Sequence, residues 1–302
     1  MNTSVDSLRH PKEQTYFTVL AVIAVLIWIP LIPFALFGIP ITLMVLLFVW
    51  LSLQYFKAVI LGDSVKVSPS QYPEIYERAE NLRVELGMSS LPEIYILNSH
   101  GIVQATAARV LGNKYIFLYS SLVDLMLLKG HSKELDFILG HELGHHAAGH
   151  ISIWKSVLLV IVKHFPLIGK AYSRACELTA DRIGHHLVKD EMVSKRALAA
   201  LALGSGALIE DLNIEAFQQQ EKEIPDVMAF IHKVFSGYPR TTRRVIEIEE
   251  FAKYSQYMNT QQGTTQSYSN TQSTSQSTKF CGKCGVSNGA TDKFCSGCGN
   301  GL

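Results

Sequence analysis

The longest apolar stretch of the chain lies near its start. No residue between positions 14 and 56 is charged, and this run is about twice the twenty residues that one helix needs to cross the hydrocarbon core of a membrane. Two membrane crossings are therefore predicted. Pro30, Pro33, Gly38 and Pro40 fall in the middle of the run, where a tight turn between antiparallel helices tolerates broken backbone hydrogen bonding.

The flanks of this run predict its orientation. A cleavable signal peptide is the main alternative, but the run is too long for one, and no small-residue cleavage site follows a short apolar core. Basic residues flank both ends, whereas the turn is uncharged: Arg9, Lys12, Lys57 and Lys66. Because cytoplasmic loops carry the excess of lysine and arginine, we expect a multi-pass protein of the cell membrane with both termini in the cytoplasm. Residues 1–13 form its cytoplasmic N-terminus and 14–62 its transmembrane helical hairpin.

A mixed domain, which also faces the cytoplasm, is expected over residues 63–255. Apolar residues at helical spacing from Ile75 to Leu86 predict a helix that Gly87 ends. Short runs rich in strand-forming residues predict three strands, at 93–97, 102–107 and 114–119. Helical spacing returns at 193–207 and 224–235. The expected fold class is α+β, mainly α, with a small β-sheet.

The segment 151–172 is apolar but interrupted by lysines at positions 155, 163 and 170. Its uncharged core is far too short to span a bilayer. We expect a helix that lies on the cytoplasmic leaflet or dips into it, with the lysines at the headgroups. A buried core helix fits the pattern nearly as well.

One short helical motif carries the clearest chemistry. His141 and His145 are four residues apart, so on a helix both imidazoles lie on one face and can bind one ion. Glu142 lies about 100° further round the helix and can reach a water on that ion without binding the ion itself. His146 and His150 fall on other faces of the same helix, and we expect neither to join the site. A solvated helix that carries this pattern by chance is the alternative.

A second motif supplies the rest of a metal site. Glu177 and Asp181 are also four residues apart on a probable helix face. Catalytic zinc typically takes three protein ligands and leaves a fourth position to water, so Glu177 is the expected third ligand. Asp181 is expected to orient a ligating histidine by accepting its hydrogen bond. The alternative is that both acids form surface ion pairs with Arg174.

These motifs together resemble those of the HtpX-like membrane metalloproteases, relatives of the CAAX prenyl proteases and of minimal soluble gluzincins. The matching residues are His141-Glu142-Leu143-Gly144-His145, then Ser173-Arg174, Glu177 and Ala180-Asp181. The resemblance covers about residues 64–251, with a membrane segment ahead of them. It implies a gluzincin-like metalloprotease domain with a catalytic zinc.

Two segments depart from the family pattern. An extended peptide must be held straight across a zinc site, and pairing with a strand edge achieves this without reading side chains. Residues 102–107 are the expected edge, although relatives carry Asn-Ala where this chain has Gln104 and Ala105. Strands that merely cover the active-site helix are an equally good interpretation. Tyr238 replaces a family histidine while Arg244 is in place, which leaves any oxyanion role of this region open.

The composition changes sharply after residue 255. Polar uncharged residues dominate positions 256–279 and predict a flexible linker. The closing segment 280–302 carries two Cys-x-x-Cys pairs, at Cys281, Cys284, Cys295 and Cys298. Four thiolates at this spacing predict a zinc ribbon with a closed structural zinc site, whose metal supplies most of its stability. Two disulfides are the alternative, which a cytoplasmic location disfavours.

Charge argues against nucleic-acid binding. The 302 residues carry a formal net charge of +1, which gives no electrostatic footprint for a nucleic acid. The tail has only Lys279, Lys283 and Lys293 against Asp292, too few to track phosphates. A protein partner is therefore the better expectation for the ribbon, and no nucleic acid is expected.

The combined features predict a membrane-anchored zinc metalloendopeptidase that acts in membrane-protein quality control or processing. It would use one catalytic and one structural zinc ion, contact the bilayer, and cleave proteins or peptides, membrane proteins among them. Glu142 would take a proton from the zinc-activated water and deliver it to the leaving amine. The alternative is a non-catalytic membrane adaptor that recruits partners through its ribbon, although a scaffold has no need of the full His-Glu-His-Glu set. A prenyl-protein protease would need a larger ring of membrane helices than one hairpin.

Overall fold

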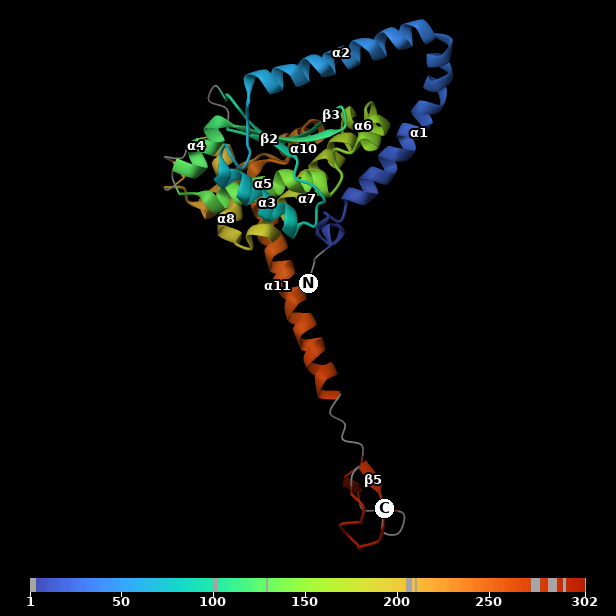
Figure 1. Ribbon diagram of the computed structural model, residues 1–302, viewed down its shortest axis with the longest axis vertical. Coiled ribbons are helices and arrows are strands. Elements are labelled where there is room, and N and C mark those ends of the chain that lie inside the picture. The colour runs from blue at the N-terminus through green and yellow to red at the C-terminus, as the bar shows by residue number, and fades with distance from the viewer. Residues whose placement is uncertain are drawn as a thin grey trace. The chain divides into compact units, whose positions relative to one another are not determined.

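The computed structural model describes residues 4–99, 103–128, 130–204, 208–209, 211–272, 278–281, 287–289 and 292–301. The chain divides into two compact units, Met1–Phe251 and Ala252–Leu302. Each unit is described by itself. The first unit is mainly helical with one small mixed sheet (Figure 1), which confirms the predicted fold class.

Two long apolar helices open the first unit. They are α1 (Glu13–Phe37) and α2 (Ile39–Asp63), and both are long and apolar enough to cross a membrane. Only 11% of the most apolar window of α1 and none of that of α2 is buried within the protein. Core helices of a soluble protein are mostly buried, so the exposure of these two favours a membrane setting.

The turn between these helices is shorter than predicted. Pro30 and Pro33 lie inside α1, and only Gly38 separates the two helices, with Pro40 in the first turn of α2. In an apolar environment an open turn would expose several unpaired backbone groups, which costs more than the one hydrogen bond that each proline removes. The helices also do not pack as a close antiparallel pair, because they diverge from Gly38 and meet the domain at separate places (Figure 1).

The sheet has the strand order β1-β2-β4-β3. Its strands are β1 (Val65–Lys66), β2 (Glu93–Leu97), β3 (Ala105–Val110) and β4 (Asn113–Tyr119). Strand β4 pairs parallel with β2 and antiparallel with β3, so β3 is an edge strand. The register of β3 differs from the predicted 102–107 because the tight turn is at Leu111 and Gly112, both with positive φ, so that Val110 pairs with Asn113. Residues 100–102 lie outside the described part of the chain.

Helix α5 (Ser132–Ala147) is the centre of the first unit, in contact with strands β3 and β4 and with four helices. Those neighbours are α3 (Pro73–Glu85), α4 (Ser120–Leu128), α7 (Ile168–Val188) and α8 (Glu191–Leu203). Further elements are α6 (Ile153–Leu159), α9 (Ile214–Gln219), α10 (Asp226–Phe235) and the 3₁₀ turns η1 (Val5–Leu8), η2 (Val162–His164) and η3 (Gln220–Glu223). The sheet and α4 pack on α5 through fully buried side chains: Ile94, Ile116, Leu118, Leu122, Met126, Leu135 and Leu139. The predicted helices near 75–86 and 224–235 are thereby confirmed as α3 and α10. The predicted helix 193–207 is confirmed as α8 up to Leu203, and residues 205–207 lie outside the described part of the chain.

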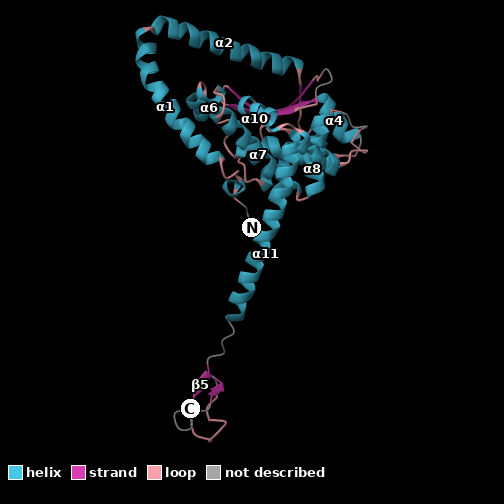
Figure 2. Cartoon of the chain, turned by 180° about the vertical axis from the view of Figure 1, so that it is seen from behind, coloured by secondary structure: helices cyan, strands magenta, loops and turns pink. Residues whose placement is uncertain are grey.

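Helix α11 (Thr241–Gln272) runs through most of the predicted linker. Its first turns pack into the core through Val245 and Ile248, and this anchored start lets the helix propagate one hydrogen bond at a time into the polar sequence. Composition alone predicts no such start. Residues 273–277 lie outside the described part, and the second unit closes with a hairpin of β5 (Thr278–Phe280) and β6 (Ser287–Gly289) (Figure 2).

Candidate active site

Helices α5 and α7 bring three polar side chains to one point. The Nε2 atoms of His141 and His145 are 3.2 Å apart. Carboxylate oxygens of Glu177 lie 3.4 Å from Nε2 of His141 and 3.7 Å from Nε2 of His145. Ligand atoms around a tetrahedral zinc with bonds of about 2.0–2.1 Å are about 3.3 Å apart. The spacing of these three donors therefore fits one zinc ion.

Glycines let the two helices approach closely enough for this. A Cβ atom at Gly140 of α5 would lie 2.8 Å from Cδ1 of Leu187, and one at Gly184 of α7 would lie 2.8 Å from the carbonyl oxygen of Phe137. Neither contact is sterically possible without a shift, because carbon atoms pack at about 3.5–4.0 Å. The close packing holds Glu177 over the face of α5 that carries both histidines.

A buried acid orients His141 from behind. Nδ1 of His141 lies 2.9 Å from Asp181, and Arg244 donates two hydrogen bonds of 2.8 and 2.6 Å to the same carboxylate. Burial works to raise the pKa of Asp181, but Arg244 and His141 hold it well below its usual range. The ionised Asp181 can accept the Nδ1 proton of His141, which leaves Nε2 as the metal-binding atom. Asp181 thus lies where the sequence predicts the orienting acid.

His145 has a partner that the sequence analysis missed. Nδ1 of His150 lies 2.9 Å from Nδ1 of His145, and Nε2 of His150 lies 3.3 Å from the carboxylate of Glu13. The prediction that His150 faces away from the site is wrong, because α5 ends at Ala147 and the helical wheel stops there. Gly149, with a φ of 69°, turns the chain so that His150 comes back over His145. His146 does face away, with Nε2 3.0 Å from the carbonyl oxygen of Tyr115.

Glu13 belongs to the first turn of α1, so a residue of the membrane helix reaches the site. Glu13 is buried. It accepts a hydrogen bond from the Thr179 hydroxyl of α7 and forms an ion pair with Arg9. A continuous chain of contacts therefore runs from Glu13 through His150 to His145. Two signals for it were present in the sequence: an acid at the head of an apolar run, and a glycine that stops a helix just before a histidine.

Glu142 lies beside the donor set. Its carboxylate accepts a hydrogen bond from the backbone N–H of Ala107 on β3. Burial is the largest influence on this group and, with the nearby Glu177 and against the opposing effect of His141, raises its pKa to about 7. A carboxylate with that pKa can take up and release a proton near neutral pH, as a general base and acid must.

The three metal donors and Glu142 line a cavity of about 640 Å³. One wall is the edge strand, where Gln104 and Ala105 face the cavity. Gln104 directly precedes β3, and its carbonyl accepts a hydrogen bond of 3.1 Å from the backbone N–H of Tyr119. The expected substrate-binding edge and the three metal donors therefore line one cavity, and an extended peptide paired with that edge would lie next to the donors.

Tyr238 also lines this cavity. The carboxylate of Glu177, burial and Glu142 together raise the pKa of its phenol, so the hydroxyl stays protonated at neutral pH. Arg244 also lines the cavity, although two of its donors bind Asp181. Both residues that the sequence leaves open for an oxyanion role therefore border the site.

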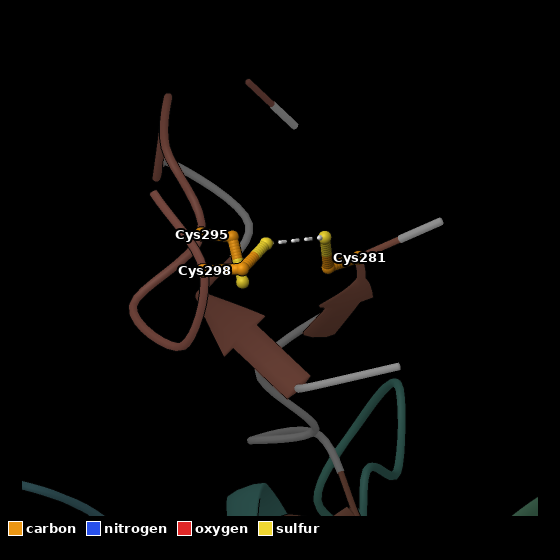
Figure 3. A group of neighbouring side chains, drawn as sticks. All are labelled: Cys281, Cys295 and Cys298. Atoms are coloured by element: carbon orange, nitrogen blue, oxygen red, sulfur yellow. Dashed lines mark hydrogen bonds between the residues drawn. The ribbon is translucent and has the colours of Figure 1, made fainter. Parts of the chain in front are cut away.

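Three of the four tail cysteines converge in the second unit. The Sγ atoms of Cys281, Cys295 and Cys298 lie within 4.8 Å of one another, and those of Cys281 and Cys298 are 3.6 Å apart (Figure 3). Sulfur ligands on a tetrahedral zinc with bonds of about 2.3 Å are about 3.8 Å apart, so these thiols fit such an ion. Cys284 lies outside the described residues.

The fold and the cavity define a metallopeptidase: two histidines one helical turn apart, an acid on a second helix, and a buried glutamate beside an edge strand. The family model for peptidase family M48 matches residues 69–163 and 152–252. The chain therefore belongs to peptidase family M48, whose members are zinc-dependent metalloproteases.

Curated relatives agree with this assignment. The plastoglobule-localized metallopeptidase 48 of Arabidopsis thaliana is 26% identical over 224 residues, which is 65% of this chain and 62% of the relative. A Protease HtpX homolog of Tropheryma whipplei strain Twist is 24% identical over 240 residues, covering 65% of this chain and 80% of the relative. The HtpX-like resemblance is thereby confirmed, and together with α1 and α2 it indicates a membrane protein. No solved structure matches the chain at comparable significance.

Proposed function

We propose that the protein is a membrane-anchored zinc metalloendopeptidase that hydrolyses peptide bonds in membrane-protein quality control or processing. The convergence of His141, His145 and Glu177 beside Glu142 is the observation that carries this proposal. A non-catalytic adaptor needs neither that donor set nor a buried base, and family M48 does not favour it. A prenyl-protein protease, which encloses its site in a larger ring of membrane helices, fits two apolar helices poorly.

In this proposal, His141 and His145 through Nε2 and Glu177 through its carboxylate hold the catalytic zinc. Bound there, zinc would polarise the substrate carbonyl and activate a water. Glu142 would act as the general base that takes a proton from the attacking water, and as the acid that delivers it to the leaving amine. Asp181 and His150 orient the two imidazoles, and the hydroxyl of Tyr238, which lines the cavity, is the proposed hydrogen-bond donor to the substrate oxygen.

The substrate is a protein or peptide in extended form, which pairs with the edge presented by Gln104, Ala105 and the rest of β3. Backbone pairing holds the scissile bond across the cavity and places little demand on side chains. Juxtamembrane segments of membrane proteins suit this arrangement, because α1 and α2 keep the cavity close to a bilayer.

The tail is proposed to be a zinc ribbon with one structural zinc held by Cys281, Cys284, Cys295 and Cys298, in addition to the catalytic ion. Residues 280–302 form this module, residues 256–279 connect it, and residues 63–255 form the protease domain behind the 14–62 anchor. A protein partner is the proposed ligand of the ribbon. The lysine and arginine flanks of the anchor support a cytoplasmic location for the protease domain and both termini.

Casein hydrolysis tests the proposed activity. The purified full chain in nanodiscs is expected to degrade fluorescein-labelled casein, to stop when 1,10-phenanthroline removes the metal, and to recover when zinc is added back. The non-chelating isomer 1,7-phenanthroline is the control and should leave the rate unchanged. Hydrolysis that continues after the metal is gone would contradict the proposal.

His150→Ala is expected to weaken zinc binding about 10- to 100-fold, because an outer hydrogen-bond partner fixes the tautomer and orientation of a ligating histidine. The affinity can be measured by competition with a chromophoric chelator. His146→Ala is the matched control, since its ring contacts the Tyr115 carbonyl and not a donor of the site. Equal zinc affinities in the two variants would show that His150 does not support His145.

A further inference from the structure

Helix α10 carries an apolar face that the protein does not cover. None of its residues is buried, and Val227, Phe230 and Phe235 are 65%, 62% and 64% exposed. Together with Met228 and Ile231, these residues occupy one side of the helix, while His232 and Lys233 lie on the other. A helix of a soluble domain turns such a face toward the core. This one presents it to the surroundings.

Helix α6 and the connection to α7 extend the same kind of surface. Large apolar side chains are exposed along them: Ile153, Trp154, Val157, Val160, Phe165 and Leu167. The C-terminal end of α10 is tied to this connection, because the backbone N–H of Leu167 donates a hydrogen bond of 3.1 Å to the carbonyl oxygen of Val234. We call the exposed apolar residues of α6, of its connection to α7 and of α10 the apolar platform. Contiguous exposed apolar areas of this extent mark contact with a membrane or a protein.

Contacts of the platform with α1 favour a membrane over a protein partner. Phe17 of α1 packs edge-to-face on Trp154, with ring centroids 5.7 Å apart, and Trp28 of α1 donates a hydrogen bond of 3.1 Å to the carbonyl oxygen of Leu158. Trp28 is fifteen residues beyond the start of α1 at Glu13, or about 22 Å along the helix axis. Helix α6 therefore packs beside α1, a helix that is long and apolar enough to cross a membrane, and its exposed apolar side chains adjoin those of α1.

Charge on the same elements also matches a lipid surface. The segment from α6 to the start of α7 carries Lys155, Lys163 and Lys170 with no acidic residue, and α10 carries Lys233 against Asp226. Nζ of Lys155 lies 5.0 Å from the ring of Phe17 and 5.6 Å from that of Trp154, a lysine-aromatic arrangement that suits a membrane interface. Anionic headgroups attract lysines placed in this way.

We propose that the apolar platform lies in the cytoplasmic interface of the bilayer that α1 and α2 cross, with α10 as a second, monotopic anchor. Both views place α6 and α10 on the side of the domain that the arch of α1 and α2 encloses (Figures 1 and 2). The sequence predicts one interfacial helix over 151–172, whereas the structure divides this segment among α6, η2 and the start of α7. The chain turns at Leu167, with a φ of 64°, so α6 lies at the interface, while α7 leaves it and carries Glu177 into the site.

This placement has a consequence for the cavity. Lys163 and His164 from the α6–α7 connection, Lys170 from the first turn of α7 and Tyr238 from the loop after α10 line it. Its rim is therefore built from the same segments as the apolar platform, and it opens beside the lipid headgroups. If the protein is the protease proposed above, its substrate is a polypeptide segment that emerges from the bilayer and enters the cavity without crossing open water.

Lipid photocrosslinking tests the platform without relying on catalysis. The full chain would carry p-benzoylphenylalanine in place of Val227, in nanodiscs that contain a fluorescent phospholipid. Val84 on α3 is the matched control, because it is also a valine, is 60% exposed and belongs to a helix on the side of the domain away from the arch (Figure 1). At least about tenfold more lipid adduct is expected at position 227 than at 84, since an interfacial helix buries its apolar face about 5–10 Å into the headgroup boundary.

Equal adduct yields at the two positions would overturn the proposal. Crosslinking of position 227 to a second copy or to another protein, with little lipid adduct, would overturn it too and assign the platform to a protein partner. Circular dichroism and melting of both variants would establish that the chain is folded in each case.

A substrate comparison tests the consequence for the cavity. V227E/F230E is expected to cleave a substrate that is anchored by one transmembrane helix about tenfold more slowly than wild type, and fluorescein-casein within about twofold of the wild-type rate. Equal losses on both substrates would contradict delivery from the bilayer. If wild type cleaved neither substrate, the protease proposal would fail, whereas the crosslinking result would still decide where the platform lies.

Discussion

Glu142→Gln is expected to lower peptide-bond hydrolysis by about 10²- to 10⁴-fold, the usual contribution of a positioned general base, while the chain keeps its zinc. Glutamine has nearly the same shape, and its amide oxygen can still accept the hydrogen bond from the Ala107 backbone. It cannot take a proton from water. The measurement is the initial rate of casein cleavage in nanodiscs, beside zinc analysis of the same preparation.

Glu77→Gln is the control for this change, because it removes an exposed carboxylate of α3 that does not line the cavity. It should retain the wild-type rate. If Glu142→Gln also cleaved casein at the wild-type rate with its zinc in place, the assigned base, and with it the proposed mechanism, would be wrong.

Metal content is expected to be two zinc ions per chain in wild type and one in each of His141→Ala and Cys281→Ala. His141→Ala removes one of three ligands of the catalytic ion and should abolish casein hydrolysis. Cys281→Ala removes one of four thiolates from a module that has almost no core, so the ribbon loses the metal that stabilises it. Inductively coupled plasma mass spectrometry on protein of known concentration measures both losses.

The two variants should differ in activity as well as in which ion they lose. Cys281→Ala is expected to keep casein hydrolysis, because the catalytic donors all belong to the first unit. A wild type with a single zinc that His141→Ala removes would rule out the structural zinc of the tail. Loss of both ions in either variant would mean that the two sites depend on each other.

The convergence of the metal donors could be predicted because it follows from local geometry. His141 with His145, and Glu177 with Asp181, each depend only on the four-residue spacing that puts two side chains on one helical face. That the two faces meet is inferred from the third protein ligand that a catalytic zinc needs, and from the family resemblance. The two faces meet because Gly140 and Gly184 permit close packing of α5 and α7. Nothing in the sequence around either glycine indicates which helix packs against it.

Other features depend on where elements end, which the sequence defines poorly. A helical wheel continued past Ala147 predicts that His150 lies away from the site, but α5 ends at that residue. The strand near position 105 begins and ends later than its strand-forming residues predict, because Leu111 and Gly112 form the turn to β4. In the tail, polar composition predicted a flexible linker, and no local pattern reveals that a helix rooted in the core continues to Gln272.

The contact of Glu13 with His150 makes the anchor part of the catalytic apparatus and more than a tether. A water-soluble fragment that starts after α2 would lack the carboxylate that holds His150 against His145. It would also uncover Tyr172 and Cys176, which pack against α1. Such a fragment would be a poor stand-in for the whole enzyme, and inhibitor screens or affinity measurements are better carried out on the intact chain in lipid.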